Sequence, residues 1–340
     1  MKNGAGIVDR IDYKETANYC LKKYPKYCEK IIRKSDDILE NKFIFDMPWD
    51  MERTEEVVDF GNKTDWYFML SDDAEFLFQL NRHTYLICLL QSYYLTGDEK
   101  YVEKTCAVLE NWIDTAIKDD GDLSPWRPLE VGFRGESWVQ IALYLEGTSF
   151  FRGAFKSKFI KSMKEHIDVL YNTHTSFQIS SNWGIIQNSG LFSLSCYLNE
   201  SNKTKAAYER LCKASLFQIM ADGMHWEQSS GYHNAVLISF LNVLNIAKQY
   251  NFTLSERFLG RVKDLAKINE KWVKPNHCHP LIGDSDNNDI RDILTRCAYL
   301  FESGSFKYLG LDSLDYDSLW FFGIKGEENI IRLYRKSQAF

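Results

Sequence analysis

The chain has 340 residues and a mass of 39.8 kDa, which exceeds the usual size of one compact core. We therefore expect one large single-architecture domain or two smaller ones. Hydrophobic residues make up 45% and charged residues 26%, with 6 Pro and 19 Gly, which is typical of a folded soluble protein and excludes disorder or a fibrous repeat. The net charge of −6 argues against a general nucleic-acid-binding protein, although a local basic groove stays open.

From the residue pattern we expect no secretory signal and no membrane-spanning segment in this chain. Its first 15 residues are polar rather than apolar, and no run approaches the roughly 18 apolar residues of a membrane span. The eight cysteines are spread singly, which indicates free thiols and favours a reducing compartment. From these residues we expect no membrane partner and no nucleic-acid partner, and they leave the oligomeric state open.

Apolar residues recur at helical spacing along most of the chain. From His83 to Tyr94 they recur at intervals of three and four residues. Residues 96–98 interrupt this pattern, and a second helical pattern follows and continues to Trp112. These two segments predict a helical hairpin. Further helices are expected over residues 136–147, 156–171, 182–198, 204–220, 233–250, 255–272 and 289–302.

About ten to twelve helices in consecutive pairs predict an all-α fold built from stacked hairpins. An open solenoid would need a short repeat, and none is visible, so we favour an (α/α) toroid, an incomplete helical-hairpin barrel, over residues 1–305. After residue 306 the pattern becomes β-like at residues 318–322 and 330–334. We therefore expect residues 306–340 to form a linker and the first strands of a truncated β-sandwich.

The densest group of chemically active side chains lies at residues 222–234, which hold two His, one Glu, one Tyr and one Trp before an apolar helix. We expect Gly231 to allow a tight turn, which would place Tyr232 and His233 in the first turn of that helix. Backbone N–H groups there favour an anion. The alternative is that Tyr232 anchors the loop and His233 only caps the helix.

Three further segments carry candidate polar residues. Ser180, Ser181 or Asn182 can cap the helix that follows them. Residues 126–134 and 78–83, the latter expected at a helix start, place arginines beside aromatic rings. This arrangement suits carboxylate or sulfate recognition, and equally a salt-bridged helix start.

Residues 277–289 resemble a metal-binding segment, because His277, Cys278 and His279 precede a run of acidic and amide residues. However, Asp289 stands where a calcium loop needs Gly, and Thr295 stands where it needs Glu. We therefore expect no metal ligands and no cofactor, with a structural divalent metal kept as the less favoured alternative.

In their order and spacing, seven motifs between about residues 35 and 290 resemble the N-terminal domain of the heparinase II/III group of polysaccharide lyases. They are residues 80–83 (LNRH), 95–101 (LTGDEKY), 111–112 (NW), 129–134 (LEVGFR), 181–182 (SN), 222–233 (DGMHWEQSSGYH) and 282–286 (IGDSD). The resemblance implies an α/α toroid followed by a β-sandwich, and β-elimination at a uronic acid in an acidic polysaccharide. It also implies a periplasmic or secreted location, with a cytoplasmic one left open.

β-Elimination gives the matching residues their roles. The uronate carboxylate must be offset by a hydrogen-bond donor, and Asn182 resembles the family's carboxylate-binding Asn. Tyr232 matches the family's catalytic Tyr, and a phenol can act as base or acid once nearby cations lower its pKa. The substrate-binding residues that accompany these two in the match are Arg82, His83, Arg134, His225, Glu227 and His233. We expect His225, His233 and Arg134 to favour the phenolate, and a His from the β-sandwich to complete the site.

Two other functions stay open. A glycoside hydrolase would use Glu136, Asp222 and Glu227 as paired carboxylates. A non-catalytic module would bind the acidic polysaccharide without cleaving it. In either case, an acidic protein that binds a polyanion must concentrate its positive charge. The expected wall of that groove is Arg82, Arg127, Arg134, Lys271 and Lys274.

Overall fold

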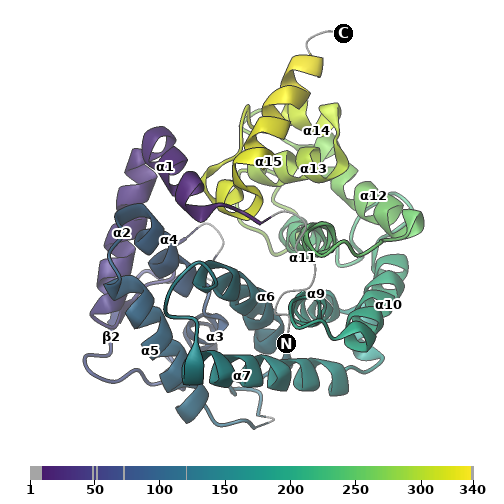
Figure 1. Cartoon of the computed structure of the whole chain (residues 1–340). Helices are drawn as coiled ribbons and strands as arrows, with labels where there is room; N and C mark the ends of the chain where they lie inside the picture. Colours follow the sequence, from purple (N-terminus) through teal and green to yellow (C-terminus); the bar gives the residue numbers. More distant parts are fainter. Residues whose placement is uncertain (1–9, 48–49, 51–52, 72, 120, 338–340) are drawn as a thin grey trace. The chain divides into compact units, whose positions relative to one another are not determined.

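The computed structural model describes residues 10–47, 50, 53–71, 73–119 and 121–337 (Figure 1). Within these ranges the chain forms fifteen helices and one small antiparallel sheet. It divides into two compact units, one of them Ala17–Thr173 and the other His174–Phe340 together with the residues up to Thr16. No helix in the described ranges is long and apolar enough to cross a membrane.

The unit Ala17–Thr173 consists of helical hairpins around an aromatic core. Helix α4 packs against α2, α5 and α6, and α7 packs against α5 and α6. Trp112 and Trp138 are among its largest fully buried side chains. Its elements are the end of α1 (Tyr13–Lys23), α2 (Pro25–Leu39), β1 (Lys42–Phe43), β2 (Val58–Asp59), α3 (Ala74–Arg82), α4 (Leu86–Thr96), α5 (Lys100–Thr115), α6 (Pro128–Leu145) and α7 (Gly153–Asn172).

The second unit places an inner helix α9 against α8, α10 and α11. Every residue of α9 from Gly184 to Cys196 is buried, so this helix is covered on all sides. In Figure 1, α9 and α11 are seen nearly end-on, with α10 and α12 outside them. The elements are α8 (Phe177–Ser180), α9 (Asn182–Tyr197), α10 (Ser201–Gln218), α11 (Ser230–Gln249), α12 (Glu256–Trp272), α13 (Arg291–Phe301), α14 (Gly304–Leu309) and α15 (Tyr316–Ser337).

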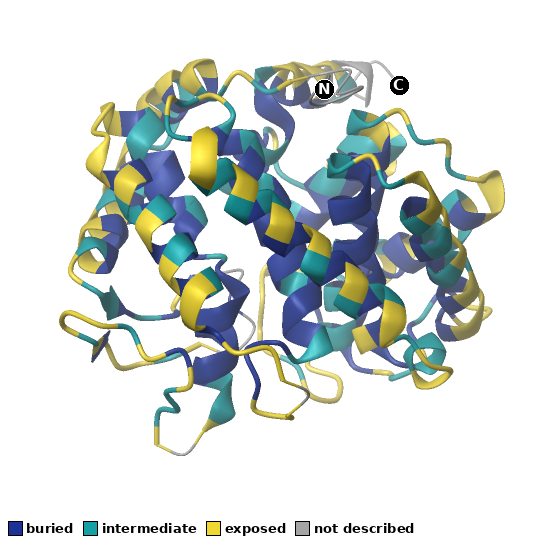
Figure 2. Cartoon of the chain, turned by 60° about the horizontal axis from the view of Figure 1, so that its bottom comes forward, coloured by how far each residue is buried: buried dark blue, intermediate teal, exposed yellow. Residues whose placement is uncertain are grey.

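The all-α class predicted from the spacing is confirmed, and helices occur close to all the expected ranges. Many of them expose one side and bury the other, as Figure 2 shows by colour. This is the amphipathic pattern from which they were predicted. Closure of the hairpins into a toroid and the domain boundary at residue 305 stay predictions.

The expectation of a helix start at residues 78–83 was wrong, because these residues end α3. Asp73 caps that helix by accepting the N–H of Glu75, and His83 closes it in a left-handed conformation with φ 59°. Gly231 does not form a tight turn either, since it lies inside α11. A Cβ there would come within 3.0 Å of the Asp284 carbonyl oxygen, so this glycine permits a close approach between two backbones.

The predicted strands at residues 318–322 and 330–334 were also wrong, because both lie in helix α15. Leu319 and Phe322 are buried, and their spacing of three fits one face of a helix. Gly323, with φ 64°, is non-helical and kinks α15 between the two predicted strands. Helix α15 packs on α13 and α14, so the described part of residues 306–340 holds no strand.

Candidate active site

Asn182 forms the first turn of α9, and its backbone is fixed from two directions. The Ser181 hydroxyl caps the helix by accepting the N–H of Trp183 at 3.2 Å. The Asn182 N–H points to Oε1 of Glu227 at 3.4 Å. Burial raises the pKa of Glu227, and the Asn182 N–H partly opposes this. A carboxylate at a helix N-terminus is stabilised by the helix dipole. Glu227 therefore helps to hold Asn182 at the start of α9.

A chain of buried hydrogen bonds ties the start of α9 to α10, α11 and α12. The Gln218 side-chain nitrogen donates to the carbonyl oxygens of Ile179 and Ser181, at 2.8 and 3.0 Å. Its Oε1 lies 3.0 Å from Nε2 of His225. The His225 backbone N–H then donates to Nδ1 of His233 at 3.3 Å.

The last bond of this chain fixes the protonation of His233. Its Nε2 lies 3.1 Å from the Leu265 carbonyl oxygen and therefore donates, while its Nδ1 accepts. The ring is thus neutral. In the same way, His225 donates through Nε2 to Gln218, and its buried Nδ1 has no hydrogen-bond partner among the described residues.

The pKa values of the two histidines agree with this geometry. Burial lowers the pKa of His225 to about 4. Burial, with a smaller contribution from His225, lowers the pKa of His233 to about 3. Both rings are therefore uncharged at neutral pH, and both are completely buried. The expectation that they supply positive charge beside Tyr232 was wrong, because the desolvation of an imidazolium in this core costs too much.

Tyr232 lies in the first turn of α11, as predicted. Its N–H donates to the capping hydroxyl of Ser229 at 3.2 Å. Tyr232 is half-buried as a residue, and its hydroxyl donates to Oδ2 of Asp284 at 3.3 Å. The segment that carries Asp284 is bound to the helix start, because Ser229 donates to the Asp284 carbonyl oxygen and the hydroxyls of Ser230 and Ser285 lie 2.8 Å apart. Two motifs fifty residues apart in the sequence thus meet at Tyr232.

Four other predicted residues, Arg82, His83, Arg127 and Arg134, belong to the unit Ala17–Thr173. Arg82 donates to the buried carboxylate of Glu130 at 2.6 Å, and Arg127 reaches the same carboxylate at 2.5 Å. Burial opposes the ionisation of Glu130, but the two arginines outweigh it and lower its pKa. His83 is fully buried and accepts the indole N–H of Trp138 at 3.0 Å. Burial holds the pKa of His83 well below its usual value.

Arg134 is completely buried in the same unit, so the geometry gives it a structural role rather than direct contact with a substrate. Its guanidinium donates to the carbonyl oxygens of Asn81 and Pro125, each at 2.8 Å, and to Nε2 of His166 at 2.7 Å. It also lies 4.2 Å from the ring centre of Trp112, which gives a cation–π contact. Burial lowers the pKa of Arg134 to about 9, so it stays charged at neutral pH.

The structure thus joins Asn182, Glu227, His225 and His233 through hydrogen bonds in one unit, and binds Tyr232 to Asp284 there. Gln218, on which the network depends, was not predicted from the sequence. The sequence feature that could have identified Gln218 is a polar residue at a buried helical position. It follows the buried Leu211 on α10 by seven residues, where an apolar residue is usual.

The two ends of the segment at residues 277–289 are joined by its own backbone. Cys278 and Asp289 form an isolated β-bridge, and the Ile290 N–H donates to the His277 carbonyl oxygen at 3.0 Å. The Asp289 carboxylate binds Arg291. Within the described ranges, no group of three His, Cys, Asp or Glu side chains is arranged to hold a metal ion.

Two of the three acidic residues proposed for hydrolysis have backbone partners. Asp222 is exposed and accepts the N–H of Met224 at 2.9 Å. Glu227 is the acceptor for the Asn182 N–H. Glu136 lies on α6, in the other unit.

These features define a domain of helical hairpins with an Asn and a Tyr at the starts of two adjacent inner helices. The family model described as heparinase II/III N-terminus matches residues 12–308. The chain therefore belongs to the heparinase II/III N-terminal domain family, which confirms the resemblance found in the sequence.

Two curated relatives are similar to part of this chain. A heparin-sulfate lyase of Bacteroides thetaiotaomicron is 26% identical over 231 residues, which cover 65% of this chain and 32% of that protein. One from Pedobacter heparinus is 26% identical over 234 residues, covering 67% and 35%. The chain thus spans about a third of the length of these curated relatives.

The solved structures share the fold. A crystal structure of heparinase III matches with a TM-score of 0.68 at 22% identity, over 82% of this chain and 46% of that one. Heparan sulfate lyase HepC from Pedobacter heparinus matches with a TM-score of 0.66 at 22% identity, over 91% and 47%.

Proposed function

We propose that this chain is the helical part of a lyase that cleaves a uronic-acid-containing acidic polysaccharide by β-elimination. The favoured substrate is heparin- or heparan-sulfate-like, with an alginate-like chain as the alternative. One observation carries the proposal: Asn182 and Tyr232 begin two helices, α9 and α11, that pack against each other and are linked by the Gln218–His225–His233 chain. The names of the relatives support the same reaction class.

The first step is the neutralisation of the uronate carboxylate. The C5 proton next to this carboxylate is only weakly acidic, and negative charge develops on the carboxylate as the proton leaves. The side-chain amide of Asn182 provides a donor at the start of α9, where the helix dipole also favours negative charge. Glu227 and Gln218 keep this helix start in place.

The second step moves two protons and two electron pairs, because the C4–O pair leaves with the departing oxygen. The C5–H bond breaks, its electron pair forms the C4–C5 double bond, and the C4–O bond breaks toward the leaving sugar. The base gains the C5 proton, and an acid gives a proton to the departing oxygen. Tyr232 is the proposed proton carrier, because it lies at the start of α11 and its hydroxyl is held by Asp284. His225 and His233 act as buried neutral supports.

The test uses the new double bond, which is conjugated to the carboxylate and absorbs ultraviolet light. Heparan sulfate, heparin and alginate are incubated with the whole lyase of which this chain is the proposed helical part, as the wild type, Tyr232→Phe and Asn182→Ala. Tyr308→Phe serves as the matched control, because Tyr308 is 83% exposed. We expect the absorbance to rise with the wild type and the control. Loss of the proton carrier should lower the rate about 10²–10⁴-fold in Tyr232→Phe.

Each other outcome contradicts the proposal in a specific way. An unchanged rate in Tyr232→Phe would remove this residue from the mechanism. New reducing ends without absorbance would indicate a hydrolase and direct attention to Glu136, Asp222 and Glu227. Binding without cleavage of any substrate would favour a non-catalytic binding module.

A further inference from the structure

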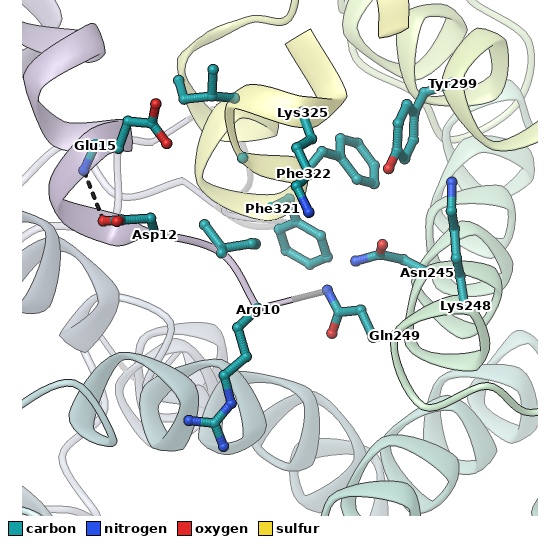
Figure 3. Close-up of a pocket in the computed structure, with 13 residues that line it drawn as sticks. Arg10, Asp12, Glu15, Asn245, Lys248, Gln249, Tyr299, Phe321, Phe322 and Lys325 are labelled. Atoms are coloured by element: carbon teal, nitrogen blue, oxygen red, sulfur yellow. Dashed lines mark hydrogen bonds between the residues drawn. The ribbon is translucent and has the colours of Figure 1, made fainter. Parts of the chain in front are cut away.

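A cavity of about 280 Å³ lies within the unit that contains the candidate active site (Figure 3). It is formed by the C-terminal end of α11, by α13 and α15, and by residues 10–15. Asn245 on its wall follows Tyr232 by 13 residues on the same helix, which corresponds to about 20 Å at 1.5 Å per residue. The cavity is therefore distinct from the proposed site of cleavage.

Two side-chain amides on the cavity wall have buried atoms that lack a partner. Asn245 is only 4% exposed, and its Nδ2 has no hydrogen-bond partner among the described residues. Oε1 of Gln249, one helical turn further on, is also a buried atom without a hydrogen-bond partner among the described residues. Both side chains extend from α11 toward Phe321 in Figure 3. One donor and one acceptor thus remain to be satisfied, and a buried unpaired polar atom is costly.

The charged groups around the cavity favour an anion. Arg10, Lys248 and Lys325 line it, together with the acidic Asp12 and Glu15. The Asp12 carboxylate is already used as a cap of α1, because it accepts the backbone N–H of Glu15 at 3.0 Å. The lining residues thus carry three cations and two carboxylates, which leaves one net positive charge.

Aromatic rings complete the wall. The Lys248 ammonium lies 4.3 Å from the ring centre of Tyr299. The rings of Tyr299 and Phe322 lie 4.4 Å apart, and Phe321 lines the cavity beside them. Such rings provide an apolar surface for the C–H face of a flat ligand, while the amides and cations bind its polar edge.

We propose that this cavity binds a single sugar acid, with its carboxylate at Lys248, its hydroxyls at Asn245 and Gln249, and its ring against Phe321 and Phe322. The volume lies at the small end of the range for ligand sites, which suits one sugar unit rather than an oligosaccharide. Binding at this second site requires no catalysis, so it can be tested independently of the proposed β-elimination.

The test is a nuclear magnetic resonance titration of the ¹⁵N-labelled chain with glucuronate. Glucose is the neutral probe and acetate the simple anion. We expect glucuronate to shift the side-chain amide signals of Asn245 and Gln249, with a Kd of about 1 mM for a ligand of this size. Lys248→Gln should weaken binding about tenfold. Lys205→Gln, at an exposed lysine of α10, should leave it unchanged.

Lys248 is exposed, so its substitution does not threaten folding. Equal binding of glucose would overturn the proposed charge recognition, and equal binding of acetate would overturn the proposed sugar recognition. Shifts at Asn182 without shifts at Asn245 would place the ligand at the candidate active site instead. No shift with any probe would show that the cavity holds water only.

Discussion

Replacing Gln218 by Leu should test whether the buried hydrogen-bond chain supports the candidate site. The glutamine is completely buried, and its amide is the partner of the Ser181 carbonyl oxygen and of the His225 ring N–H. The substitution removes the Gln218 partner of the His225 ring N–H and of the Ile179 carbonyl oxygen, whereas the Ser181 carbonyl oxygen still accepts the N–H of Gly184. Each buried unpaired group costs about 1–3 kcal/mol, so the free energy of unfolding should fall by about 2–6 kcal/mol.

The measurement is urea unfolding followed by circular dichroism, with the cleavage rate measured on the folded protein. Phe217→Leu is the control, because Phe217 is the neighbouring residue on α10 and is 59% exposed. It should change the stability by less than about 0.5 kcal/mol. A loss below about 1 kcal/mol in Gln218→Leu, or an equal loss in both variants, would refute the reasoning.

Three further predictions concern the same units. Because burial sets the pKa of His225 to about 4 and of His233 to about 3, against 6.5 ordinarily, the unfolded chain binds more protons than the folded one between these values. Stability should therefore fall as the pH is lowered from 6.5 toward 4, by about 3–5 kcal/mol per ring at most, and a flat unfolding profile would contradict this. Arg134→Met leaves two backbone carbonyls and an imidazole unpaired, so its thermal unfolding should show a loss of at least about 3 kcal/mol. Gly184→Ala would place a Cβ 1.8 Å from the Gln178 carbonyl oxygen, which should displace the start of α9 and lower the cleavage rate more than substrate binding.

Local signals in the sequence determined where the candidate site begins. Ser181 and Ser229 cap α9 and α11, which places Asn182 and Tyr232 in the first turns of these helices. Capping depends on a side chain and a backbone N–H two or three residues away, so it can be read from neighbouring residues alone. The helical period in most of the chain is equally local.

Only the tertiary structure decided the charge and the accessibility of the site residues. The sequence suggested cations at His225, His233 and Arg134, but the two histidines are neutral and all three are buried. Desolvation depends on residues distant in the sequence that surround a group. The apolar runs near the C-terminus were predicted as strands, because short apolar runs fit a strand and a helix equally well. The structure shows that they are helical and belong to α15, which packs on α13.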